Sequence, residues 1–187
     1  MRKPDMQRAT TLLMIRKADE DAREISGIAS TPTPDRYGDV IESAGAVFST
    51  PLPLLWMHDH TKAIGSVTLG AASTAGVAFA ARIAKIDAAG PLKDRVDEAW
   101  QSIKTGLLRA VSIGFRPLES EPMKSGGTRF TKWEWLELSL VTIPANPDAL
   151  ITDSREFEPD YVRAFLAEAR ARQPRLKHAP TPVVRLK

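Results

Sequence analysis

The first two thirds of the chain alternate between short apolar stretches and clusters of proline, glycine and charged residues. Such spacing is typical of β-strands separated by turns. Alternation is clearest in residues 76–86, and large apolar residues on both faces of 128–143 indicate a strand that is buried on two sides. Two prolines and a glycine predict a loop over 31–39. The pattern predicts strands over 12–17, 23–30, 54–58, 64–69, 76–86, 107–116 and 128–143.

A three- and four-residue apolar spacing predicts one helix in the middle of the chain. The helix is expected to begin near Pro91 and to end near Gly106, with an apolar stripe from Leu92 to Leu107. The same spacing predicts a second amphipathic helix over 160–172. The chain therefore combines a strand-rich body with helical segments.

Composition agrees with one globular domain and an appendage, since 43% of the 187 residues are hydrophobic and 26% are charged. We place the folded domain at 10–152 and the appendage, an amphipathic helix with a basic, proline-containing tail, at 153–187. The formal net charge of +3 is unevenly distributed, because residues 170–187 carry six Lys and Arg residues and no acid. Such a charge run favours a solvated tail. We expect no signal peptide and no membrane span.

Cysteine is absent, which excludes disulfides, thiolate metal sites and a cysteine nucleophile. Two of the three histidines, His58 and His60, follow an apolar stretch. On an extended strand they point to the same side, as two ligands of one metal do. A catalytic metal usually needs a third protein ligand, and His178 lies in the tail. Carboxylates are further candidate ligands, so a metal-dependent hydrolase remains an alternative.

A serine hydrolase is the other chemistry that the residues allow. Ser112 has small neighbours on its own face of the predicted strand, and Gly114 lets a substrate backbone come close. Serine needs a neighbouring base to remove its proton, and histidine is the usual one near neutral pH. Spacing alone does not separate Ser112 from a structural serine. A Ser–Lys pair with Lys124 or Lys132 also stays open.

Glu137 is the third residue of interest, because it lies on an apolar strand between Trp135 and Leu138. A carboxylate in such a place is costly to bury without a partner. A solvent-facing position is slightly favoured when the residue is considered alone. A histidine partner would compensate for burial and be oriented in return.

Four segments of the chain form an ordered set: DRYGDVI with GAVF at 35–48, LLWMHD with IG at 54–65, AVSIGF at 110–115 and ELSLVTIPANP at 137–147. Each segment is weakly specific alone, whereas the ordered set is specific and covers roughly residues 25–150. Together these segments resemble the prohead maturation proteases of tailed bacteriophages, which are related in fold to the herpesvirus assemblins.

The resemblance implies a serine endopeptidase that cleaves the scaffold region of the major capsid protein, and also itself, during procapsid maturation. It implies a mainly β fold, a closed and mostly antiparallel β-barrel with flanking helices. The expected partner is the major capsid protein with its scaffold region, inside the assembling procapsid in the host cytoplasm. Self-association is left open. We expect no metal, no cofactor, no membrane and no specific nucleic acid.

Carried over position by position, the resemblance makes Ser112 the nucleophile and His58 the general base. We assign the third catalytic role to Glu137. Assemblins use a second histidine in this role, which leaves His60 as the rival. On a strand the Cα atoms of His58 and His60 would be about 6.6 Å apart, with both side chains pointing outward in parallel. That arrangement is poor for one ring to orient the other.

Backbone N–H groups near Ile113 and Gly114, or a residue of the 144–147 turn, are candidates for the oxyanion hole. Two other classes of function remain as alternatives. One is a non-catalytic assembly or scaffolding protein with the same fold. The other is a metal-dependent hydrolase that uses His58 and His60.

Overall fold

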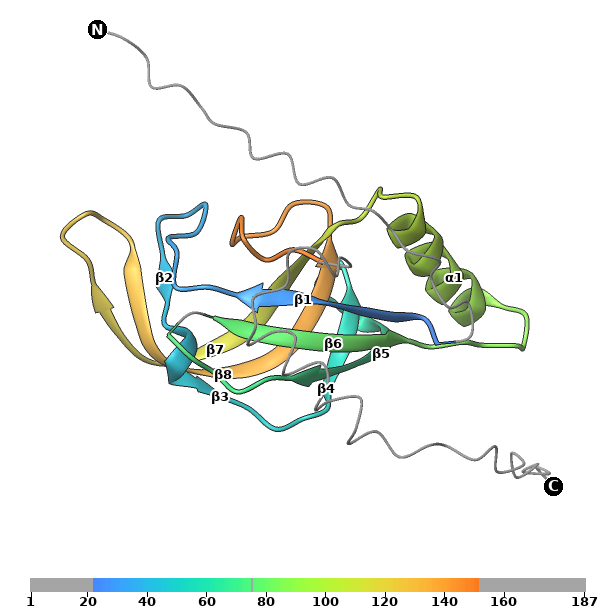
Figure 1. The fold of residues 1–187 in the computed structure, drawn as a ribbon, viewed down its shortest axis with the longest axis horizontal. Helices are drawn as coiled ribbons and strands as arrows, with labels where there is room; N and C mark the ends of the chain where they lie inside the picture. The colour runs from blue at the N-terminus through green and yellow to red at the C-terminus, as the bar shows by residue number, and fades with distance from the viewer. Residues whose placement is uncertain (1–21, 75, 152–187) are drawn as a thin grey trace, which may run out of the picture.

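The computed structural model describes residues 22–74 and 76–151, which form a strongly curled sheet with one helix beside it (Figure 1). The predicted strand at 12–17 and the appendage at 153–187 lie outside these residues. The elements, in chain order, are β1 (Glu24–Ser30), β2 (Val40–Ile41), the 3₁₀ turn η1 (Ser43–Gly45), β3 (Ala46–Val47), β4 (Leu52–Trp56), β5 (Asp59–Leu69), β6 (Val77–Ile83), α1 (Pro91–Lys104), β7 (Ala110–Pro122) and β8 (Thr128–Val141).

β8 is the strand that organises the sheet. β7 pairs with it antiparallel along one edge, while β2, β3 and β4 pair with it parallel at successive positions along the other. From β4 the sheet continues through antiparallel pairs to β5, β6 and β1. The end of β8, buried on both sides from Glu137 to Val141 as predicted, lies at the centre of this arrangement.

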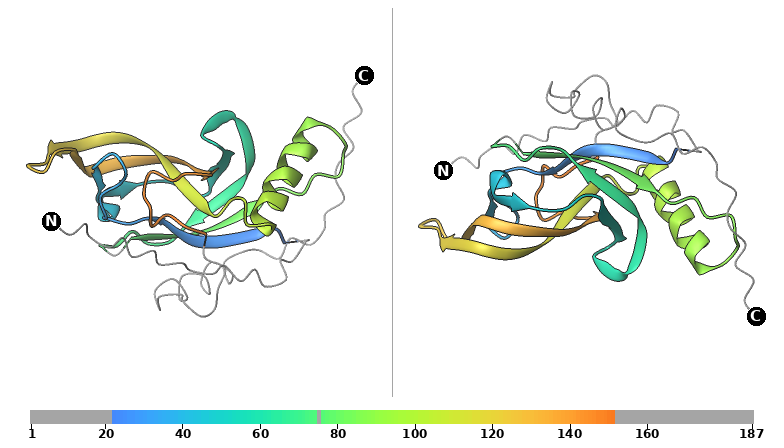
Figure 2. Two further views of the ribbon diagram at one scale, coloured as in Figure 1. Left: turned by 90° about the horizontal axis from the view of Figure 1, so that it is seen from above. Right: turned by 90° about the horizontal axis from the view of Figure 1, so that it is seen from below.

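The mainly β fold class is confirmed, but the closed barrel is not. Within the described residues no ladder joins β1 to β7, so the sheet is an open, curled half-barrel (Figure 2). Single bridges from Ile151 to Gly27 and from Leu150 to Ala110 tie the segment after β8 to both edges. β1 and β7 therefore do not pair to close the barrel, because this irregular segment lies between them.

α1 begins at Pro91 as predicted and covers one end of the sheet (Figures 1 and 2). Its buried face is narrower than the predicted stripe, because Leu92 and Leu107 are exposed. The residues that pack into the core are Val96, Ala99, Trp100 and Ile103. A strongly positive φ of 73° at Gly106 follows the end of the helix, in the left-handed conformation that glycine tolerates best. No helix in the described part of the chain is long and apolar enough to cross a membrane.

The last half of β7 and the first half of β8 extend beyond the body as a two-stranded arm (Figure 1). β7 continues six residues past the predicted end at Arg116, to Pro122. Nearly all of this extension is exposed, so it has no apolar alternation for a sequence pattern to detect. A bulge between the Gly114–Glu137 and Phe115–Trp135 pairs leaves Leu136 exposed, contrary to the two-sided burial expected there.

Candidate active site

A two-residue turn places His58 at the tip of the β4–β5 hairpin, whereas the sequence pattern extended the strand through it. Met57 and His58 both have positive φ, 51° and 58°, between the paired residues Trp56 and Asp59. Positive φ at both central residues is the signature of a type I′ turn, which glycine and asparagine usually fill. Such conformations are unfavourable for residues with a Cβ atom, so neighbouring contacts must hold the turn.

Those contacts come from β8. The N–H of Met57 donates to the carbonyl of Leu140 at 3.0 Å, and the N–H of His58 donates to Oγ of Ser139 at 3.1 Å. The parallel pairing of β4 with β8 brings these residues together across about 80 positions of sequence. The turn that carries His58 is thus fixed to the buried end of β8.

Glu137 is the partner of the His58 ring. Its Oε1 lies 2.7 Å from His58 Nδ1, and its side chain is only 5% exposed, whereas that of His58 is 43% exposed. The second carboxylate oxygen, Oε2, accepts a hydrogen bond of 2.7 Å from Ser139 Oγ. The sequence left open whether Glu137 faces solvent or is buried against a histidine. In the structure it is buried, and its partner is His58.

The carboxylate alters the acid–base behaviour of the ring. The hydrogen bond with Glu137 and its negative charge raise the pKa of His58 above its usual value of 6.5, although partial burial opposes the shift. With Nδ1–H held by Oε1, the neutral ring has the lone pair of Nε2 available as an acceptor. Glu137 thus sets the orientation and the tautomer of the His58 ring.

Ser112 lies on β7 directly opposite Ser139 on β8. Facing residues of an antiparallel pair project from the same side of the sheet, which places Ser112 on the side that carries Glu137 and Ser139. Ser112 is 6% exposed. Within the described residues its hydroxyl makes no hydrogen bond, either to His58 or to any other residue. Ser112 therefore lies on the same side of the sheet as Glu137, the partner of His58, but it is not hydrogen-bonded to the His58 ring.

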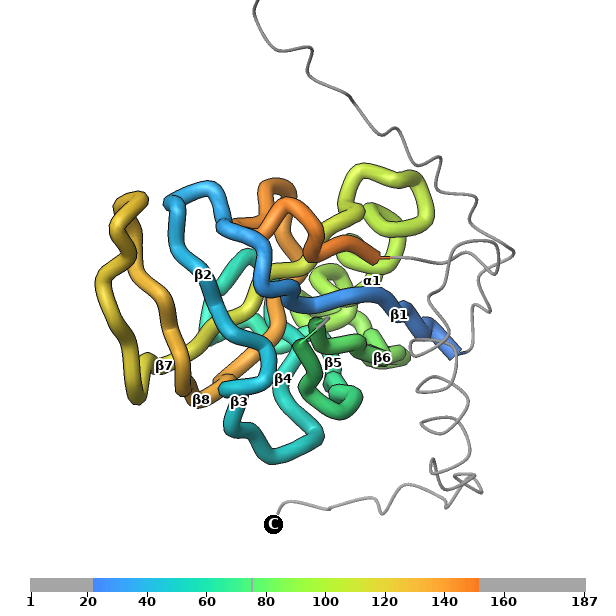
Figure 3. The backbone as a smooth tube through the Cα atoms, turned by 60° about the vertical axis from the view of Figure 1, so that its left-hand side comes forward, coloured from blue at the N-terminus to red at the C-terminus, as the bar shows by residue number. Residues whose placement is uncertain are grey.

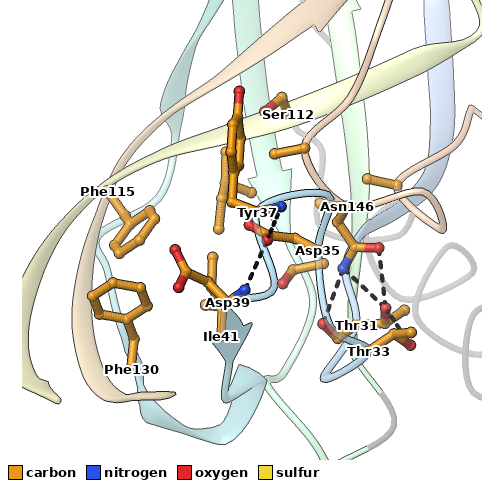
Figure 4. Close-up of a pocket in the computed structure, with 15 residues that line it drawn as sticks. Thr31, Thr33, Asp35, Tyr37, Asp39, Ile41, Ser112, Phe115, Phe130 and Asn146 are labelled. Carbon is orange, nitrogen blue, oxygen red and sulfur yellow. Dashed lines mark hydrogen bonds between the residues drawn. The ribbon is translucent and has the colours of Figure 1, made fainter. Parts of the chain in front are cut away.

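Ser112 also forms part of the wall of a cavity (Figure 4). The wall includes three residues near the predicted oxyanion positions, Ile113, Ala145 and Asn146. The sequence offered two candidates for the oxyanion hole, the backbone that follows Ser112 and the 144–147 turn. Both therefore border the cavity next to the Ser112 hydroxyl.

The loop over 31–39, predicted from its prolines, forms the opposite wall of this cavity. Figure 3 shows the chain after β8 running beside this loop. Hydrogen bonds join them: Arg36 N–H and Nε donate to the carbonyls of Ala145 and Pro144, both at 3.0 Å. Asn146 Nδ2 donates to the carbonyl of Thr31 at 3.0 Å. These contacts fix the cavity between two loops.

His60 is not part of the cluster. It lies exposed on β5, and the structure records no bond from it to His58 or Glu137. The metal hypothesis required the rings of His58 and His60 to lie on the same face of one extended strand. They do not, because His58 is in a left-handed turn. No group of three or more His, Asp or Glu residues in 22–74 and 76–151 is arranged to hold a metal ion.

The lysine candidates also lie away from Ser112. Lys132 is on the arm, where its Nζ lies 3.3 Å from Oε1 of Glu119. It is separated by seven positions along β8 from Ser139, the residue opposite Ser112, which is about 23 Å of strand. Lys124 lies at the turn of the arm, between the two strands. Neither Lys124 nor Lys132 therefore pairs with Ser112 in the described part of the chain.

Sequence reasoning missed Ser139. Its hydroxyl joins the carboxylate of Glu137 to the backbone of His58, and it is completely buried. The available signal was its position two residues after Glu137, which places both side chains on one face of the strand. A buried hydroxyl on the face of a buried carboxylate is a natural hydrogen-bond partner.

Comparison with known proteins gives the affiliation of the chain. A family model described as caudovirus prohead serine protease matches residues 16–160. The chain is 48% identical over 152 residues to the capsid polyprotein of Pseudomonas phage PAJU2, covering 81% of this chain and 23% of that protein. It is 30% identical over 148 residues to the prohead protease of Escherichia phage T5, covering 72% of this chain and 66% of that protein. The match thus spans less than two thirds of either relative. The chain belongs to the family of caudovirus prohead serine proteases.

Proposed function

We propose that the chain is an endopeptidase in which Ser112, His58 and Glu137 are nucleophile, general base and orienting carboxylate. The observation that carries this proposal is the 2.7 Å contact between His58 Nδ1 and Glu137 Oε1, on the same side of the sheet as Ser112. A buried carboxylate that holds one ring nitrogen leaves the other nitrogen for proton transfer, which is the arrangement of a catalytic triad.

In the proposed reaction, Nε2 of His58 takes the proton of the Ser112 hydroxyl while Oγ attacks the scissile carbonyl carbon. His58 then gives this proton to the leaving amine as the peptide bond breaks, which leaves an acyl ester on Ser112. Water attacks the ester by the same route and restores the hydroxyl. The Ser112–His58 hydrogen bond closes on substrate binding, since catalytic hydrogen bonds are often long in free enzymes. Glu137 stabilises the imidazolium that forms in each step.

The oxyanion that develops on the carbonyl oxygen needs donors that are already in place. We assign them to backbone N–H groups of the cavity wall around Ile113 or in the turn at Ala145 and Asn146. These groups adjoin the Ser112 side chain, and two loops fix their positions through hydrogen bonds.

The proposed substrate is the scaffold region of the major capsid protein, together with the chain itself, inside the assembling procapsid. Membership of a prohead protease family supports this substrate. The relative in phage PAJU2 carries the name capsid polyprotein, and this chain matches 23% of it. A protease-like segment within a longer capsid protein is consistent with cleavage in the same chain.

The test is co-expression of the full chain with the major capsid protein of its phage, followed by intact-mass measurement of both. Wild-type enzyme should shorten the capsid protein, whereas Ser112→Ala should leave it at full length. Ser66→Ala is the matched control, because Ser66 is an exposed strand serine on β5. Full-length capsid protein with the wild-type enzyme would favour a non-catalytic assembly protein.

A second measurement identifies the nucleophile without a known substrate. A fluorophosphonate should add to wild-type protein once, and peptide mapping should place the adduct on Ser112. The adduct forms when Oγ bonds to phosphorus and fluoride leaves, while His58 removes the hydroxyl proton. Labelling that persists in Ser112→Ala, or cleavage that a chelator stops and a phosphonate does not, would contradict the proposed triad.

A further inference from the structure

The cavity beside Ser112 has the size of a single side chain. Its volume is about 200 Å³, which is below the ~300–1,000 Å³ of pockets that hold drug-sized ligands. Ser112 is 6% exposed, and its hydroxyl, without a recorded hydrogen-bond partner in the described chain, adjoins this cavity. A largely buried serine whose hydroxyl borders an empty space is a natural place for a ligand to meet the serine.

One side of the cavity is apolar. Phe115 and Phe130 contact each other edge to face, with ring centroids 5.1 Å apart, and Ile41 lies near them (Figure 4). Ile113 lines the same cavity. A surface of this kind packs well against a chain of methylene groups. The side chains of this surface offer no hydrogen-bond partner to a polar group.

The wall of the cavity also carries two carboxylates, Asp35 and Asp39. Oδ1 of Asp35 accepts hydrogen bonds from the N–H groups of Tyr37 and Asp39, at 2.8 and 2.9 Å. Oδ1 of Asp39 accepts a hydrogen bond of 2.7 Å from the N–H of Thr128. Each carboxylate is thus fixed by backbone donors through one oxygen, and the structure records no hydrogen bond to the other oxygen.

The cavity has no positive charge of its own. None of its fifteen lining residues is Lys, Arg or His. The nearest arginine in sequence, Arg36, donates Nε to the carbonyl of Pro144, and Arg129 pairs with Glu42. Two partly buried carboxylates without a countercharge favour a cationic ligand, since desolvated charge is stable only when it is paired.

We infer that this cavity is the primary specificity pocket and that it receives a lysine or arginine side chain of the substrate. The methylene stem lies against Phe115 and Phe130, and the charged head reaches Asp35 and Asp39. The inference rests on the proposed role of Ser112 as nucleophile and adds the chemical class of residue that the enzyme recognises.

The side chain in question belongs to the residue that contributes the scissile carbonyl. After attack by Ser112 Oγ, only the carbonyl carbon separates Oγ from the Cα atom of that residue. The Cα atom on the leaving side is one atom further away. A cavity with the nucleophile in its wall is therefore reached most directly from the acyl side.

Two peptidyl diphenyl phosphonates that differ only in the residue next to phosphorus test the inference on the full chain. One carries lysine and the other norleucine, which has a similar stem without the charge. Oγ of Ser112 bonds to phosphorus, and phenol leaves with the hydroxyl proton. Intact mass gives the labelling rate of each probe, and the lysine probe should react about 10- to 100-fold faster.

Asp35→Asn and Asp39→Asn, singly and together, keep the Oδ1 acceptor and remove the charge. We expect the lysine-to-norleucine rate ratio to fall about 10-fold in a single variant and to approach one in the double variant. Asp87→Asn is the control, because Asp87 is exposed and outside the cavity, and its ratio should equal that of wild type.

The outcomes separate this inference from the proposed triad. Rapid labelling of Ser112 by both probes at equal rates in wild type would overturn the basic pocket and leave the triad in place. A high ratio that the double variant retains would also overturn it. Failure of both probes to label Ser112, with the protein folded by circular dichroism, would overturn both proposals.

Discussion

Gly114 on β7 lies directly opposite Glu137 on β8, and its missing side chain leaves the space that the carboxylate occupies. A Cβ atom placed on Gly114 would lie 2.1 Å from Oε1 and 2.7 Å from Cδ of Glu137, far inside van der Waals contact. The same Oε1 lies 2.7 Å from His58 Nδ1. The glycine therefore determines whether the carboxylate can reach the ring.

Gly114→Ala should lower peptide cleavage strongly because the added methyl group displaces the Glu137 carboxylate from His58. We expect a loss of kcat/KM of about 10²- to 10³-fold, close to the loss from removing the orienting carboxylate itself. In a Glu137→Ala background the same change should cost little more, since the space is then empty. If the losses of kcat/KM from the two single changes multiply in the Gly114→Ala/Glu137→Ala double variant, Gly114 acts independently of Glu137.

The sequence pattern located most strands but not the turn that matters for the site. β1, α1 and β8 begin within a residue of their predicted positions, because apolar periodicity and Pro91 mark them. The type I′ turn at Met57 and His58 has neither glycine nor asparagine, so it carries no local signal. Contacts with Ser139 and Leu140, distant in sequence, hold it instead.

For the candidate site, the sequence proposed a set of residues and not their arrangement. Family resemblance implied Ser112 and His58, and the logic of a catalytic triad added Glu137, while residue chemistry alone left the burial of Glu137 open. The missing information was the parallel pairing of β4 with β8, which brings His58 to Glu137. Parallel pairs are made through long connections, so no local pattern encodes their register. The open half-barrel was missed for the same reason, since closure depends on non-local pairing of β1 and β7.

Ser139→Ala should reduce catalysis while leaving the protein folded. The variant removes the hydrogen bond to Glu137 Oε2 and the acceptor for the His58 N–H, so the carboxylate and the left-handed turn both lose support. We expect kcat/KM to fall about 10-fold, in line with a hydrogen bond to a charged group. Ser43→Ala is the control, because Ser43 is equally buried and its hydroxyl has no recorded partner. A Ser139→Ala enzyme as active as Ser43→Ala would exclude a positioning role.

His58→Ala should be nearly inactive, and His60→Ala should retain most activity. His58 is the proposed base, whereas His60 is exposed on β5 and outside the cluster. Loss of a triad histidine reduces kcat by about 10⁴- to 10⁶-fold, and the Ser112→Ala/His58→Ala double variant should be no worse than either single variant. Steady-state cleavage of capsid protein measures all four enzymes. Two results together would restore the metal hypothesis: an inactive His60→Ala variant, and a wild-type enzyme whose activity depends on added zinc.

Glu137→Gln should move the pH dependence of the enzyme as well as its rate. In wild type the hydrogen bond and charge of Glu137 raise the pKa of His58 above 6.5, and the base is active only when neutral. Activity should therefore rise with pH through a midpoint above 6.5. The folded state also binds this proton more tightly than the unfolded chain, so the pair stabilises the fold below about pH 6.5 and loses that effect as pH rises through the raised pKa.

The glutamine variant keeps the shape of residue 137 and removes its charge, so the pKa of His58 should fall towards or below its ordinary value. NMR titration of the His58 ring in wild type and in Glu137→Gln measures this shift directly. The maximal rate should fall about 10²- to 10⁴-fold because the imidazolium formed during catalysis loses its counterion. A lower rate with an unchanged His58 titration would mean that Glu137 acts on the turn and not on the ring. An unchanged rate and an unchanged titration would transfer the third catalytic role to another residue.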